Sequence, residues 1–155
     1  MINMSELVRG GTVCLGKAGL AIATTTSKAK TAAPNGAGTD FAIKGILYHL
    51  ADADNNIVFT AATQAALYSI LYLVCVTAAN VITAVPGTAV LTADITSGKS
   101  VLTWPEATAS TCPIGAIRVD AGASAFVAGT TALTGGTVTV TYYDLFAVPD
   151  APLTS

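Results

Sequence analysis

The feature that most limits how this chain can fold is a long segment without charge. From Asn55 to Ala93 there is no Asp, Glu, Lys, Arg or His, and only 10% of the 155 residues are charged. Soluble globular domains usually have about 25% charged residues. Because 52% of the chain is hydrophobic, we expect it to collapse around a core, and we expect copies of itself or a larger assembly to cover much of its surface.

Alternation of side chains with a period of two, rich in β-branched residues, dominates the sequence and indicates strands. We expect these strands over residues 20–31, 41–50, 67–77, 81–85, 114–120, 125–128 and 137–143. Residues 67–77 are apolar on both sides, which is typical of a strand inside a sandwich or against a neighbouring subunit. Asp and Asn residues at 52–56 predict a turn, and residues 63–66 predict a short helical turn.

Many short strands separated by turn residues predict an all-β fold with little helix: an antiparallel β-sandwich, or a jelly-roll or barrel-like domain. We expect one domain over residues 17–147. An N-terminal arm or first strand (1–16) precedes it, and a proline-rich tail (148–155) follows it. Residues 65–84 have the length of a membrane helix, but polar residues interrupt them and no basic cluster flanks them, so we expect no membrane association.

The ionisable residues and cysteines argue against several kinds of site. The seven Lys and Arg residues are scattered, so they form no basic stripe that would bind nucleic acid. Cys14, Cys75 and Cys112 are odd in number and widely spaced, which fits neither a disulfide framework nor a zinc site. We expect them to act as small hydrophobes in a protein made in a reducing cytoplasm. No signal peptide is recognisable at the N-terminus.

Candidate catalytic and metal-binding residues are few. His49 is the single histidine, and it has no Ser or Cys motif beside it, so a structural role is favoured over general-base catalysis. Asp52, Asp54 and Asn56 copy the first ligands of a calcium loop, but the glycine and glutamate that should follow are absent. We therefore expect no enzymatic activity, no cofactor and no metal.

Two parts of the sequence form a pattern of short strands. The first is a small-residue strand at 20–24 followed by the segment 41–48, with Ile43, Gly45 and Tyr48. The second, more specific part runs through the segments 112–119, 125–133 and 138–144. Together these parts resemble virion structural proteins of tailed bacteriophages, especially small head decoration (cement) or head fibre proteins. At the level of pattern the resemblance spans about residues 20–145, and it carries no catalytic signature.

This resemblance implies a protein that is made in the host cytoplasm and becomes part of the virion. It would bind the outside of the capsid as a homo-oligomer, often a trimer, and the major capsid protein would be its partner. A tail-associated or head fibre module that binds host-surface glycans is the alternative, and a virion-associated hydrolase is a third possibility. Our candidate interface residues are Leu7, Val8, Arg9, Val13, Tyr142, Tyr143, Leu145 and Phe146. In the opposing interpretation, the arm is a first strand and the tyrosines belong to the core.

The arm hypothesis predicts the effect of a deletion. Removal of residues 1–12 should lower the oligomeric mass, measured by light scattering, and should weaken binding to capsids. An unchanged mass together with unchanged binding would reject a docking role for this segment.

Overall fold

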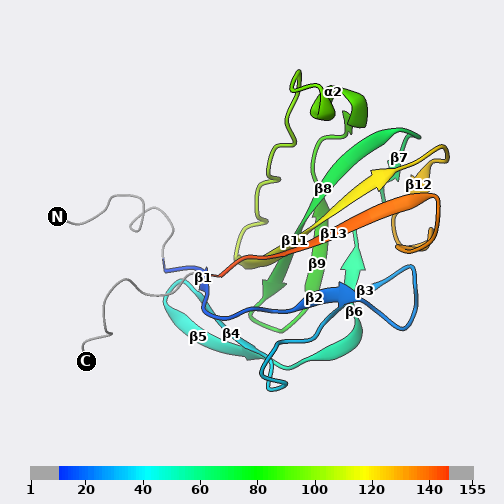
Figure 1. Cartoon of the computed structure of the whole chain (residues 1–155). Helices are drawn as coiled ribbons and strands as arrows, with labels where there is room; N and C mark the ends of the chain where they lie inside the picture. Colours follow the sequence, from blue (N-terminus) through cyan, green and yellow to red (C-terminus); the bar gives the residue numbers. More distant parts are fainter. Residues whose placement is uncertain (1–10, 147–155) are drawn as a thin grey trace.

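The computed structural model describes residues 11–146, and the regular secondary structure of this part of the chain is almost all β-strand (Figure 1). The expectation of an all-β, barrel-like fold with little helix is confirmed. The strands are β1 (Val13–Cys14), β2 (Leu20–Ile22), β3 (Ala29–Thr31), β4 (Thr39–Ile43), β5 (Ile46–Leu50), β6 (Ala53–Phe59), β7 (Thr63–Gln64), β8 (Tyr68–Thr77), β9 (Ile82–Pro86), β10 (Val90–Leu91), β11 (Thr111–Ala121), β12 (Phe126–Val127) and β13 (Val138–Asp144), and a short helix, α2 (Thr92–Thr96), follows β10.

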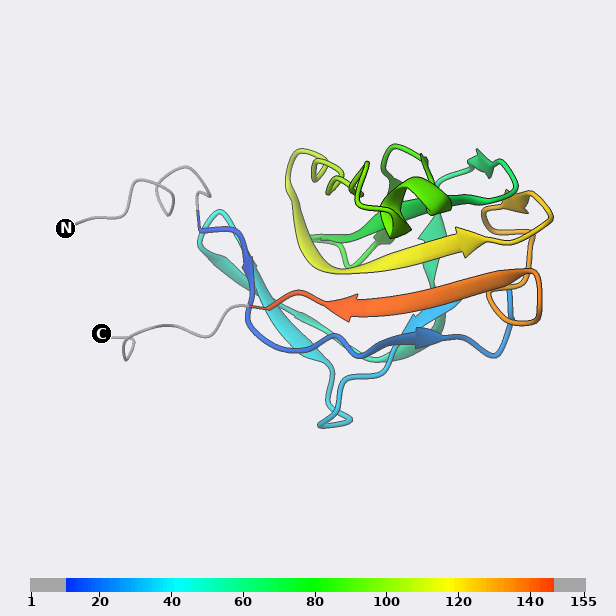
Figure 2. The ribbon, with the colours of Figure 1, turned by 45° about the horizontal axis from the view of Figure 1, so that its top comes forward.

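The largest sheet has the strand order β13-β11-β8-β9-β6-β3-β2, with β10 paired to β8. Its neighbouring strands are antiparallel except for β6 and β9, which are parallel. The sheet curls until β2 lies beside β13 (Figure 2). At this seam the backbone N–H of Leu20 donates to Asp144 Oδ1 at 3.1 Å, so the barrel-like sheet is nearly closed. The other two sheets are β1-β4-β5 and the short pair β12-β7.

The central strand β8 is buried on both of its faces, as its apolar sequence predicts. The inward face contributes Tyr72, whose ring meets Phe59 edge-on at 5.2 Å. The outward face contributes Leu71, Leu73 and Cys75, which are also buried. Figure 1 shows the chain after α2 running along β8 on its way to β11. This segment, residues 97–110, covers the outward face of β8.

Two contacts place the covering segment on β8. The Cys75 thiol lies close to Thr108 and Thr111. A Cβ added to Gly87, which follows β9, would lie 3.0 Å from Pro105 Cγ. The uncharged part of the sequence is therefore accommodated within one chain, with the core on one side of β8 and the covering segment on the other.

Two segments expected to be single strands are hairpins. Residues 20–31 divide into β2 and β3, which pair with each other around a polar turn. Residues 41–50 belong to β4 and β5, which are joined by Lys44 and Gly45 with φ angles of 53° and 80°. Such a two-residue turn with positive φ matches the twist of the flanking strands. The alternation of side chains with a period of two continues through a two-residue turn. For this reason the sequence pattern predicted a single strand.

Two further expectations of local structure were wrong. Residues 52–56, expected to be a turn, lead into and begin strand β6, and residues 63–66 contain strand β7 in place of a helical turn. Gln64 explains the second case, because its side chain is buried and its Nε2 donates to the carbonyl oxygens of Tyr68 and Val119. The long-range bond to Val119, together with the pairing of β7 with β12, outweighs the local preference for a helical turn.

The predicted arm (1–16) and tail (148–155) lie mostly outside the residues that the structure describes. Val13 and Cys14 form β1 and pair with β4, so the described end of the segment 1–16 is a strand. The rest of that segment up to residue 10, and the proline-rich tail 148–155, lie outside the described residues.

The loop before β4 offers a test of this fold. Gly36 and Gly38 both have positive φ, 67° and 86°, but only at Gly38 would a Cβ meet backbone, at 2.1 Å from the carbonyl oxygen of Leu50. Gly36→Ala should therefore lower the free energy of unfolding by about 1 kcal/mol, the cost of left-handed backbone in an L-residue. Gly38→Ala should cost at least about 2 kcal/mol more, because a packed backbone must move. Urea unfolding measures both, and equal losses would contradict the packing.

Candidate functional site

The candidate site is the outer face of the small sheet β1-β4-β5, which stands at one end of the molecule (Figures 1 and 2). Strand pairing places Val13 opposite Ala42, and Ala42 opposite Leu47. Leu15 lies two residues beyond Val13, and its N–H donates to the carbonyl oxygen of Asp40, so it continues the same face. We call the face formed by Val13, Leu15, Ala42 and Leu47 the outer face.

The outer face is apolar, and it is most accessible on the edge strand β5, whereas Ala42 on the middle strand β4 is buried. Leu47 is 69% exposed, and Val13 and Leu15 are half-buried. At the rim, Asp40 and His49 are cross-strand neighbours, and Asp40 Oδ1 lies 2.7 Å from His49 Nδ1. An apolar centre with a polar rim is the arrangement found at protein–protein interfaces.

The inner face of the same strands belongs to the core and holds the outer face in place. Cys14 and Phe41 are buried, and the Phe41 ring stacks on Tyr48 at 5.5 Å between centroids. At the far end of the hairpin, the N–H of Lys44 donates to Thr12 Oγ1. The outer face is therefore fixed by the packing of the opposite side of its own strands.

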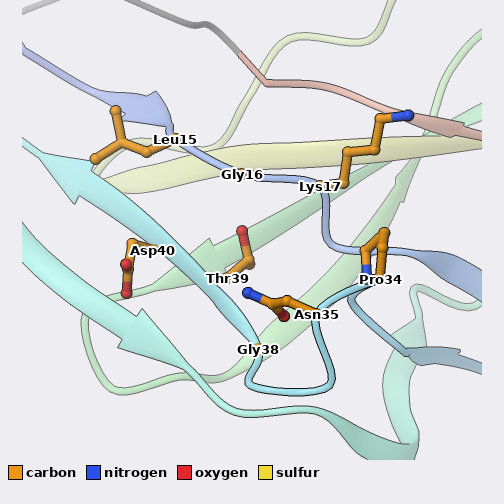
Figure 3. Close-up of a pocket in the computed structure, with 8 residues that line it drawn as sticks. All are labelled: Leu15, Gly16, Lys17, Pro34, Asn35, Gly38, Thr39 and Asp40. Carbon is orange, nitrogen blue, oxygen red and sulfur yellow. The ribbon is translucent and has the colours of Figure 1, made fainter.

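A hollow of about 390 Å³ adjoins the outer face (Figure 3). It is lined by Leu15, Gly16, Lys17, Pro34, Asn35, Gly38, Thr39 and Asp40. Figure 3 shows the Asn35 amide close to Thr39, and the Lys17 side chain pointing away from both. Asn35 Oδ1 accepts the N–H of Ala37, so part of its polarity serves the loop itself. None of the lining residues is aromatic.

The exposed His49–Asp40 pair is the nearest approach to a catalytic arrangement in the described chain. A carboxylate that holds a histidine is two-thirds of a nucleophilic triad, and the third member must lie within hydrogen-bond reach of the ring. Within residues 11–146, the hydrogen bonds of the imidazole side chain connect it to Asp40 alone. The pair is better described as a polar contact on the rim of the outer face.

The three cysteines are free and buried, as predicted from their apolar surroundings. Burial raises the pKa of the Cys112 thiol to about 12, and the nearby Cys14 and Cys75 add to the rise. Burial also raises the pKa of Cys14 and of Cys75. These thiols stay protonated at neutral pH, so they are poor nucleophiles and poor metal ligands.

The residues that copy a calcium loop are used to hold the β2–β3 hairpin. Asp52 Oδ1 accepts the N–H of Ala33, and Asp54 Oδ1 accepts that of Thr24. Asn55 and Asn56 accept the N–H groups of Thr25 and Thr31 in the same way. Within residues 11–146, no group of three His, Cys, Asp or Glu side chains is placed to hold a metal ion.

The predicted interface residues fall into separate places. Leu7, Val8 and Arg9 lie outside the described residues, and Val13 lies on the outer face. Tyr142 packs against the core, which raises the pKa of its phenol by burial, whereas Tyr143 on the opposite side of β13 is 41% exposed. The N–H of Leu145 donates to the carbonyl oxygen of Ile114. Phe146 is 43% exposed, and the Lys17 ammonium lies 5.6 Å from its ring centroid.

Sequence reasoning missed Ile46 and Leu47, which are 59% and 69% exposed beside the hairpin turn. It placed both in the middle of one long strand, where alternation would bury one of them. The dipeptide Lys44-Gly45 is the signal that could have corrected this, since glycine favours the positive φ of a hairpin turn. Trp104 and Val101 of the covering segment are likewise exposed.

Comparisons of the chain with protein-family models, with curated proteins and with solved structures gave no match. In the described part of the chain, helix α2 is too short to cross a membrane.

The bond between Asp54 and Thr24 has a measurable signature. The Thr24 hydroxyl and N–H hold the pKa of the exposed Asp54 carboxyl below its usual 3.8. A carboxyl with a depressed pKa contributes stability above its unfolded pKa and loses that contribution as the pH falls through its folded pKa. An NMR titration should therefore give a midpoint below 3.8, and Thr24→Val should raise it. A midpoint that does not change in Thr24→Val would contradict the bond.

Proposed function

We propose that this chain is a structural virion protein that decorates a tailed-bacteriophage capsid. In this role it binds the outer capsid surface as a homo-oligomer and stabilises the shell by bridging capsomers. The observation that carries the proposal is the outer face, an apolar surface whose edge strand β5 exposes 69% of Leu47 and whose opposite side packs into the core. Such a face is suited to binding another protein surface.

The composition of the chain supports an assembly role. Its surface has little charge to keep it apart from other proteins, because the formal net charge is −2 and only 10% of the residues are charged. Exposed apolar residues that gather on one face mark an interaction site more often than scattered ones do. The resemblance of residues 20–145 to head decoration proteins gives this assembly its identity: the partner is the major capsid protein, and the oligomer is often a trimer.

The proposed mechanism is binding alone. Burial of apolar surface at a contact contributes about 25 cal/mol per Å² to the free energy of binding. Part of this contribution offsets the entropy lost on association. One copy therefore needs only a modest contact with each capsomer. Copies linked in an oligomer bind the shell together, and each contact then raises the effective concentration of the next. A shell clamped at many such points resists separation of its capsomers.

Glycan binding by a tail-associated or head fibre module is the alternative. It predicts exposed aromatic side chains around a groove, on which sugar rings stack. Trp104 is 55% exposed, but it lies on the covering segment, away from the hollow, which has no aromatic lining. Decoration is favoured for this reason, and binding of the chain to a glycan array in the absence of capsids would reverse that preference.

The proposal predicts that charge on the outer face abolishes shell binding. Val13→Glu combined with Leu15→Glu should reduce co-sedimentation with undecorated capsids of the encoding phage by at least tenfold, because two carboxylates would have to be buried in an apolar contact. Val127→Glu is the matched control, since Val127 is 38% exposed on β12, at the opposite end of the molecule. Undiminished capsid binding by the double variant would overturn the proposal.

A further inference from the structure

Among residues 11–146, strand β5 is an edge of the small sheet with no strand beside it, and its backbone shows which groups are open. On β4, Ala42 and Asp40 turn their backbone groups toward β1. Ala42 pairs with Val13, and the carbonyl oxygen of Asp40 accepts the N–H of Leu15. The alternate residues of β4 therefore bond to β5. Their partners on β5 are Ile46 and Tyr48, so Leu47 and His49 turn their backbone groups away from the sheet.

A side-chain hydrogen bond verifies this direction. The carbonyl oxygen of His49 accepts Asn80 Nδ2 at 3.0 Å, on the side of β5 away from β4. Within residues 11–146, the N–H and C=O of Leu47 have no hydrogen-bond partner. Proteins usually protect such an edge with Pro, with a bulge or with inward-pointing charge. Here the open residue is Leu47, flanked by Ile46 and Tyr48.

We propose that the free edge of β5 pairs antiparallel with the same edge of a second copy of this chain, about a two-fold axis at Leu47. One N–H and one C=O on the same residue complement themselves under such an axis, so the two Leu47 residues would exchange two hydrogen bonds. The small sheets of the two copies then form one sheet of six strands. This inference rests on the proposed function and deepens it, because it makes a two-fold pair, in place of the expected trimer, the unit of the homo-oligomer and joins the outer faces of two copies into one continuous surface.

The pairing accounts for both exposed residues of the hairpin. On the outer face, the side chains of the two Leu47 residues come side by side. On the inner face, Ile46 of each copy comes opposite Tyr48 of the other, which covers the 59% of Ile46 that one chain leaves exposed. Asn80 occupies the carbonyl oxygen of His49, so it limits how far the ladder can extend in either register. Pairing about Tyr48 is less favourable, because its two central bonded pairs both need His49, whereas pairing about Leu47 needs only the open groups of Leu47 at its centre.

The charged residues near β5 favour a second copy of this chain as the partner of the open edge. In this register Gly45 of one copy comes opposite His49 of the other, so the adjacent Lys44 approaches the Asp40 carboxylate that holds His49. The two-fold axis creates this contact twice. The hairpin thus carries one positive and one negative group beside the edge that two copies would share.

The decisive experiment measures the particle mass in solution without capsids. Leu47→Pro removes the open N–H and leaves the ladder to β4 intact, because Leu47 donates no bond to β4. The mass should fall by half relative to the wild type, with an unchanged circular dichroism spectrum. Val58→Lys is the control: Val58 is 61% exposed on β6, inside a sheet, and its substitution should leave the mass unchanged. An unchanged mass in Leu47→Pro overturns the pairing.

A charge exchange gives a second, independent readout. Lys44→Asp and Asp40→Lys should each weaken the association roughly tenfold, and the double variant should regain most of the loss because the contact is restored with reversed signs. The absence of recovery overturns the proposed register. Neither measurement involves a capsid, so the two proposals can fail separately. If the wild-type chain binds capsids and Leu47→Pro leaves the particle mass unchanged, the pairing is rejected and the proposed function stands.

Discussion

The structure depends on the burial of one strand, β8, on both of its faces. The strand lies at the centre of the largest sheet, between β11 and β9. Its inward side chains, with Tyr72 among them, build the core, and its outward side chains lie under residues 97–110. Burying a large apolar side chain contributes about 1.5–3 kcal/mol. The residues of β8 therefore supply much of the free energy that holds the sheet together, and the uncharged sequence is what makes burial on two sides possible.

This arrangement explains where the few ionisable side chains of the described chain are placed. Because the middle strands of the sheet make apolar contacts, the polar side chains form their bonds at the edges and turns of the sheet. Asp144 bonds across the seam to β2, Asp52 and Asp54 hold the β2–β3 hairpin, and Arg118 pairs with Asp120 at 2.8 Å. Each of these carboxylates has a structural partner.

The sequence was informative where burial alone decides the structure, and misleading where turns and side-chain bonds decide it. The double-sided apolar pattern of residues 67–77 predicted β8, and the alternation of residues 137–143 predicted β13, because both patterns follow directly from which faces are buried. The hairpin at Lys44-Gly45 was missed, since a two-residue turn does not interrupt alternation. The start of β6 was taken for a turn, because Asp and Asn favour turns unless their side chains bond a neighbouring strand, as Asp54 bonds Thr24.

The candidate site was harder to predict for a related reason. Val13 was expected at an interface, and it does lie on the outer face, but its neighbours there come from β4 and β5 through pairings that no local pattern reveals. The aromatic residues of β13 looked like anchors, yet alternation directs Tyr142 toward the core and leaves Tyr143 exposed. Which apolar residues are left over for binding depends on how the sheet closes, and closure is a property of the whole chain.

The two faces of the small sheet are coupled, and this coupling bears on how strongly it can bind. Phe41 and Tyr48 stack on the inner face, while Ala42 and Leu47, their immediate neighbours in sequence, lie on the outer face. The same packing that stabilises the fold thus fixes the positions of the outer-face side chains in the free chain. Under the proposed function, little backbone conformational entropy would remain to be lost when a partner covers this face, so a small apolar contact would yield more of its burial energy as affinity. For a chain with few charges to direct association, a preformed apolar surface would be the most direct source of specific binding.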